Sequence, residues 1–319
     1  TSWDRAKTDI PMLGKYSSDD PNVMRQHILW AKQAGLQGFI VSWKNTDTLN
    51  RRLKQLIQIA DEQDFKLAII YQGLDFDRKP LPADQIAQGL DYFIANFSQD
   101  KAFDLYPKPL VIWSGTWEFS VPDIQKVTQP RRDKLLILAS EKNTAGYLRL
   151  MDYVDGDAYY WSSVNPDTMK SYASKLQDMS QTIHAHKGLW IAPAAAGFDA
   201  RAIGGTTIVD RKNGDTLKTE MQVALGSSPD MIGLISWNEF SENSHIEPSQ
   251  NYGMRYLDVV AEINHQPAPN VSVLDSSEPV QVANPQLAGN KMLAIGTFAF
   301  ILLGSLGLVV LRQTRHSPK

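Results

Sequence analysis

Two glutamates lie three residues apart in a segment rich in aromatic and polar side chains, SWNEFSENSHIEP at 236–248. On a helical turn this spacing places Glu239 and Glu242 on the same side. Like-charged carboxylates at close range do not both ionise easily, so one pKa is raised. A proton donor beside a base is the pair that glycoside hydrolysis needs. We therefore take both as candidate catalytic residues; the alternative is a solvated helix face, where such spacings often occur by chance.

Short apolar segments alternate with amphipathic ones along the chain. The apolar segments predict strands at 38–43, 66–71, 109–114, 134–139, 157–161, 188–193 and 231–237. The amphipathic segments predict helices at 21–34, 49–60, 83–97, 121–129, 143–151, 166–185, 217–227 and 250–264. Most of the strands are apolar at consecutive positions, as parallel strands covered on both faces are. Repeated strand–helix units predict a parallel sheet with right-handed crossovers.

This pattern falls one strand short of a (β/α)8 TIM barrel. A doubly wound open sheet is the alternative architecture, but no Gly-rich phosphate turn follows the first strand. Aromatic and polar residues instead cluster where the strands end, and a barrel gathers all those ends on one face. The sequence therefore predicts an α/β fold, a TIM barrel over residues 1–264, with its first strand missing at the N-terminus because it would precede Thr1.

Side chains at the predicted strand ends form a candidate sugar-binding surface, because aromatic rings suit the CH faces of sugars. The candidate substrate-binding residues are Trp43, Tyr71, Tyr160, Trp161, Asp199, Trp237 and Asn238. For the aromatic residues the alternative is packing inside the fold. For Asp199 the alternative, which the sequence favours, is an ion pair with Arg201 that fixes a loop. Histidines at ligand spacing are lacking, so we predict neither a metal site nor a cofactor.

The C-terminal part of the chain differs from the rest. Residues 292–311 are an uncharged apolar run long enough to cross a bilayer, so a transmembrane helix is predicted at 291–312. Basic residues follow it, which predicts a cytoplasmic tail at 313–319 and an extracytoplasmic barrel on a single-pass membrane protein. The Pro-rich segment 265–290 predicts an extended linker.

Composition excludes several classes of function. The chain has 319 residues and a net charge of −3, which gives no general attraction to nucleic acid. It has no cysteine, so a disulfide scaffold, a thiolate metal site and a cysteine nucleophile are excluded.

The glutamate segment, with Tyr252-Gly253 after it, resembles the motif of glycoside hydrolase family 99. Two further segments are similar to that family: Gly38-Phe39-x-Val41-Ser42-Trp43 and Gly197-Phe198-Asp199. The resemblance implies a metal-independent barrel enzyme that cleaves α-mannan with retention of configuration. It implies that Glu239 deprotonates the sugar 2-hydroxyl, giving an anhydro-sugar. Glu242 would then be the general acid/base.

We therefore expect a membrane-anchored glycosidase whose partner is an α-linked poly- or oligosaccharide. Ser241, Asn243, Ser244 and His245 differ from the mannosidase members, so an α-1,3-glucanase of the related family 71 type is an alternative. A barrel that binds glycan without cleaving it is another alternative, but the presence of both glutamates argues against it.

Overall fold

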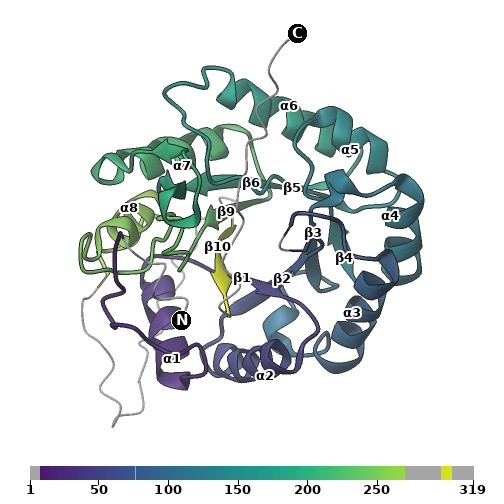
Figure 1. Ribbon diagram of the computed structural model, residues 1–319, viewed down its shortest axis with the longest axis horizontal. Coiled ribbons are helices and arrows are strands. Elements are labelled where there is room, and N and C mark those ends of the chain that lie inside the picture. Colours follow the sequence, from purple (N-terminus) through teal and green to yellow (C-terminus); the bar gives the residue numbers. More distant parts are fainter. Residues whose placement is uncertain (1–7, 76, 270–295, 304–319) are drawn as a thin grey trace.

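The apolar segments form the parallel strands of a closed barrel, and helices surround it (Figure 1). The structure is a computed structural model that describes residues 8–75, 77–269 and 296–303. Its strands are β1 Gly38–Trp43, β2 Lys66–Gln72, β3 Leu110–Ser114, β4 Leu136–Leu138, β5 Gly156–Ala158, β6 Leu189–Ala195, β9 Met231–Ile235 and β10 Gly296–Leu302. Their order is β4-β3-β2-β1-β10-β9-β6-β5, and a parallel bridge between Ala139 and Asp157 joins β4 to β5. The predicted (β/α)8 barrel is confirmed.

The amphipathic segments form the outer helices. They are α1 Pro21–Gln33, α2 Asp47–Glu62, α3 Ala83–Asn96, α4 Val121–Thr128, α5 Thr144–Leu150, α6 Tyr172–Ala185, α7 Asp215–Gly226 and α8 Arg255–Ile263. Local sequence sets where they begin: the Asp20 side chain accepts a hydrogen bond from the backbone N–H of Asn22 at 2.9 Å, and Pro21 is the first residue of α1. A two-stranded antiparallel hairpin, β7 Phe198–Asp199 and β8 Ile208–Val209, lies between β6 and α7.

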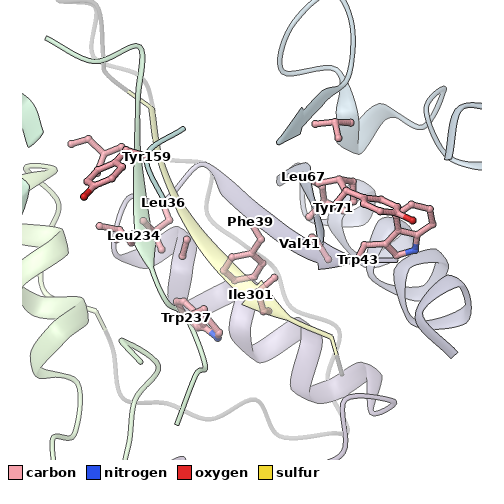
Figure 2. Packing of buried hydrophobic residues seen from close by; sticks show 14 of the residues in the cluster. Leu36, Phe39, Val41, Trp43, Leu67, Tyr71, Tyr159, Leu234, Trp237 and Ile301 are labelled. Atoms are coloured by element: carbon pink, nitrogen blue, oxygen red, sulfur yellow. The ribbon is translucent and has the colours of Figure 1, made fainter. Parts of the chain in front are cut away.

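Each strand buries both of its faces, in two separate cores. One core fills the barrel interior with side chains such as Ile40, Ile70 and Phe300. The other lies between strands and helices and takes the alternate side chains, Phe39 and Val41 among them (Figure 2). Because successive side chains of a strand point to opposite faces, consecutive apolar residues satisfy both cores at once.

The predicted transmembrane helix at 291–312 is wrong for the part of that range that the structure describes. Residues 296–302 form strand β10, which pairs in parallel with β1 on one side and β9 on the other. A long apolar run suits a strand buried on both faces as well as a lipid-facing helix, so apolarity alone does not separate the two. β10 occupies the barrel position that we predicted for a strand before Thr1.

Two glycines on the neighbouring strands make room for β10. A Cβ atom added to Gly38 of β1 would lie 2.2 Å from the Phe298 ring, and one added to Gly233 of β9 would lie 2.6 Å from the Phe300 ring. Both distances are far below van der Waals contact, so only glycine fits beside these rings. Phe298 is fully buried and Phe300 is 5% exposed. The barrel interior is therefore shaped around two phenylalanines of β10.

The remaining boundary predictions fall mostly outside the described residues. These include 270–290 of the predicted linker, 304–312 of the predicted membrane segment and the predicted tail at 313–319. Residues 266–269 contain no helix or strand. No helix in the described ranges is both long and apolar enough to cross a membrane. The extracytoplasmic location stays a prediction.

Candidate active site

The two glutamates lie in the loop that follows β9, at the end of the barrel where the strands terminate. The loop forms turns rather than the expected helical turn, with the Asn243 N–H donating to the Phe240 carbonyl at 3.3 Å. The Glu239 N–H donates to Ser236 Oγ at 2.9 Å. Glu242 is 7% exposed, and its carbonyl accepts a hydrogen bond from the Asp199 N–H at 2.7 Å. Hydrogen bonds within the loop and from the β7–β8 hairpin thus fix the backbone at both glutamates.

A buried arginine holds this loop from behind. Arg211 is 4% exposed and donates to the Asn243 carbonyl at 2.7 Å and to the His245 carbonyl. Its guanidinium carbon lies 3.9 Å from the ring centroid of Tyr256. The His245 imidazole lies 3.2 Å from an oxygen of Asp9, and burial lowers the pKa of this histidine to about 4. His245 is therefore neutral at pH 7 and acts as a fixed polar part of the loop.

Glu247 fixes the other end of the loop. One carboxylate oxygen lies 3.0 Å from His27 Nε2, and the other accepts a hydrogen bond from the Tyr16 hydroxyl at 2.8 Å. The Asn238 amide in turn donates to that hydroxyl at 3.3 Å. Glu247 is 1% exposed, so its role is to hold the loop rather than to meet a ligand. Asn238, a predicted substrate-binding residue, belongs to this network and is half-buried.

Burial raises the pKa of both candidate catalytic glutamates, and repulsion adds to the rise at Glu242. At Glu239 the cause is burial, and a hydrogen bond from the Ser241 hydroxyl to Oε1 opposes the rise. At Glu242 burial is again the largest cause; the charge of Glu239 raises the pKa further, and the charge of Arg78 opposes the rise. Glu239 therefore ionises first and Glu242 keeps its proton. This gives a base and an acid in one site.

A narrow pocket opens onto Glu242. Its lining includes the polar side chains of Gln72, Arg78 and Ser114 together with the rings of Trp117, Tyr160 and Trp161. These residues come from the ends of β2, β3 and β5 and the loops that follow them. Their convergence with the β9 loop places the pocket at the face where barrel enzymes hold their active sites.

The structure brings two of the predicted aromatic residues to this pocket. Tyr160 and Trp161 both line it. The Tyr160 ring also packs against Phe300 of β10, with 4.7 Å between ring centroids, and burial together with the charges of Glu242 and Glu239 raises its pKa. Asp199 is 4% exposed and forms an ion pair with Arg201, with 2.6 Å between its oxygen and the guanidinium nitrogen. This is the loop-fixing contact that the sequence favoured.

Three other predicted substrate-binding residues lie away from the pocket. Trp43 and Tyr71 pack together in the layer between strands and helices, with 5.8 Å between ring centroids (Figure 2). Trp237 is fully buried against Phe39 and His27. None of the three presents a ring face to the mouth of the barrel, so their structural role is packing.

Sequence reasoning missed the cations near the pocket. Arg78 lies in the loop after β2, and its guanidinium carbon is 5.9 Å from the ring centroid of Trp117. Lys142 lies in the loop after β4, and its Nζ is 4.2 Å from the same centroid. Their place just after predicted strands was the available signal. In the described part of the chain no group of three or more His, Cys, Asp or Glu residues could hold a metal ion.

Comparison with known proteins identifies the family of this chain. Residues 2–267 match the family model of glycosyl hydrolase family 99. A human glycoprotein endo-alpha-1,2-mannosidase-like protein is 23% identical over an alignment of 291 residues that covers 83% of this chain and 62% of the relative. Its mouse counterpart is 22% identical over 281 residues, with 80% and 62% covered. The chain thus spans about 62% of the length of these curated relatives.

Solved structures share the fold. The GH99 endo-alpha-mannosidase from Bacteroides thetaiotaomicron, in complex with bis-tris-propane, superposes with a TM-score of 0.71 at 21% identity. The match covers 80% of this chain and 87% of that one. With a family match over most of its length, the chain belongs to glycosyl hydrolase family 99.

Proposed function

We propose that the protein hydrolyses α-linked glycans of the mannan type, with Glu242 as general acid/base and Glu239 as the base on the sugar 2-hydroxyl. The printed names of its relatives, endo-alpha-1,2-mannosidase-like and endo-alpha-mannosidase, support this substrate class. The order in which the two carboxyl groups ionise supports the assignment of roles.

The reaction proceeds in two balanced steps. In the first, Glu239 takes the proton of the 2-hydroxyl, whose oxygen bonds to the anomeric carbon. The bond to the leaving oxygen breaks, and Glu242 gives that oxygen its proton. In the second, Glu242 takes a proton from water, which bonds to the anomeric carbon and opens the anhydro ring, while Glu239 returns its proton to the 2-oxygen. Both steps need one ionised and one protonated carboxyl group.

The observation that carries this proposal is the buried Glu242 beside the half-buried Glu239. Glu242 lines a pocket at the mouth of the barrel, and its pKa is raised by burial and by the charge of Glu239. A surface pair of glutamates would be solvated and would titrate near its ordinary range. The hydrogen bond from Ser241 favours the ionised form of Glu239, which the first step requires.

The test is release of reducing ends from α-mannan and, separately, from α-1,3-glucan. We expect release from α-mannan, and we expect Glu242→Gln and Glu239→Gln each to lower it by at least about 10²-fold, the contribution of a general acid or base. Glu220→Gln is the matched control, because Glu220 is 1% exposed and accepts a hydrogen bond from the Ala195 N–H outside the site. Release from α-1,3-glucan alone would mean that the substrate is an α-glucan and not an α-mannan. Binding of both glycans without release would overturn the proposed activity.

A further inference from the structure

A second hollow adjoins the pocket of Glu242. Its volume of about 540 Å³ lies within the range of small-molecule sites, and Trp161 and Ser163 line both it and the pocket. The rings of Tyr159 and Trp161 lie parallel there, 6.4 Å apart with an angle of 5° between their planes. Ile208 of the β7–β8 hairpin, 50% exposed, also lines the hollow. A sugar next to the one at Glu242 thus has both room and apolar surface.

Two lysines line the same hollow on its aromatic side. Lys142 Nζ lies 5.5 Å from the ring centroid of Trp161. Lys175 Nζ donates a hydrogen bond to the Tyr159 hydroxyl at 2.8 Å and lies 4.2 Å from the centroid of that ring. The aromatic contacts hold both ammonium groups at the wall of the hollow.

Among the described residues, no carboxylate lies close enough to pair with these charges. Within residues 8–75, 77–269 and 296–303, no carboxylate oxygen lies within 4.0 Å of Lys142, Lys175 or Arg78. Burial lowers the pKa of both lysines; the charge of Arg78 lowers that of Lys142 further, and the charge of Lys142 lowers that of Lys175 further. At Lys142 the charges of Glu118 and Glu141, which do not form ion pairs with it, oppose this lowering, Glu118 more strongly than Arg78 adds to it. Lost hydration and repulsion cost free energy, which an anion bound beside the lysines would recover.

We propose that this hollow binds a phosphate or sulfate ester on the glycan, next to the sugar whose bond is cleaved. The substrate class would then be an anionic α-linked polysaccharide. Lysine ammonium groups bind tetrahedral oxyanions as point charges, and the aromatic rings between them suit the sugar that carries the ester. This inference rests on the proposed function, since the hollow adjoins that active site.

The test compares one neutral α-mannan oligosaccharide with its chemically sulfated and phosphorylated forms. Calorimetric affinities are measured with the full chain carrying Glu242→Gln, which slows turnover during the titration. We expect at least one anionic form to bind about tenfold more tightly than the neutral form, and 0.5 M NaCl to reduce the preference by screening. Adding Lys142→Met and Lys175→Met should bring the ratio of affinities close to one. Lys134→Met, at an exposed lysine before β4, should keep it.

The outcomes separate this inference from the proposed function. Equal affinity for neutral and anionic forms, or a preference that survives loss of both lysines, would overturn the anion site while leaving hydrolysis of neutral glycan intact. Preferential binding by a protein that cleaves none of the three glycans would support the anion site and overturn the hydrolase proposal. The ratio of kcat/KM for sulfated and neutral substrate in the otherwise unsubstituted chain, with and without the two lysines, gives a second readout that does not depend on Glu242→Gln.

Discussion

Removing the Ser241 hydroxyl tests how the site keeps Glu239 ionised. This hydroxyl donates a hydrogen bond to Glu239 Oε1, and the backbone of Ser241 also stabilises the ionised carboxylate. Ser241→Ala removes the first interaction and leaves the second. The ionised form loses a stabilising partner, so the pKa of Glu239 should rise.

The size of this rise follows from the strength of the lost interaction. A hydrogen bond to a charged group contributes about 1.5–3 kcal/mol, and one pKa unit corresponds to about 1.4 kcal/mol. Since the backbone contact remains, we expect a rise near the lower end, about one unit. In the proposed mechanism the base is lost below the pKa of Glu239, so the acidic limb of the pH profile of kcat/KM should move about one unit toward higher pH.

The assay is the pH profile of kcat/KM on α-mannan for Ser241→Ala, with Ser98→Ala as control. Ser98 is also buried, and it lies just after α3, away from the site. Its hydroxyl donates to the Ile94 carbonyl at 2.9 Å and accepts from the Gln99 amide at 3.2 Å. The alkaline limb reports Glu242 and should not move, because Glu239 is ionised on that side in both proteins. An acidic limb that stays in place, or an alkaline limb that moves instead, would refute the reasoning.

Three other predictions concern separate parts of the molecule. Arg78→Met should raise the pKa of Glu242 further, because the charge of Arg78 lowers that pKa. The alkaline limb of the kcat/KM profile should then move to higher pH, and an unmoved limb would contradict this. Burial raises the pKa of Glu220 to about 8, so this group contributes stability fully present below pH 4.5 and lost as the pH rises toward 8. In Glu220→Gln, urea unfolding should no longer show that loss, and an unchanged pH dependence would count against the assignment. Phe298→Ala should lower the free energy of unfolding by about 3–5 kcal/mol if β10 fills the barrel, whereas a loss below about 1 kcal/mol would mean that Phe298 is not in the core.

The fold could be predicted from sequence because its main signals are local. Each predicted strand is a short apolar segment and each predicted helix an amphipathic one. Both patterns can be recognised without knowing which other elements the segment packs against. The run at 296–302 was misassigned for the same reason. Nothing local distinguishes a central barrel strand from a membrane helix, and the fit of Phe298 beside Gly38 depends on residues far apart in sequence.

The site was only partly predictable because strand ends do not reveal which face a side chain takes. Phe39, Val41 and Trp43 are alternate residues of β1, and all three point toward the helices, while Ile40 points into the barrel. Because both faces of the strand are apolar, the sequence does not show which set of alternate residues faces the barrel interior. Tyr160 and Arg78 reach the pocket through loops, whose paths are set by tertiary contacts rather than by local pattern.

The pairing of acid and base is tested most directly with an activated substrate. Fluoride needs little protonation to leave, so the rate of the first fluoride release from α-mannobiosyl fluoride depends on Glu239 but not on Glu242. On unactivated α-mannan we expect Glu242→Gln to lower the rate of cleavage at least about 10²-fold, whereas its rate of first fluoride release should be close to that of the unsubstituted protein. Glu239→Gln should be slow on both substrates. Equal losses for Glu242→Gln on both substrates would contradict its role as the acid.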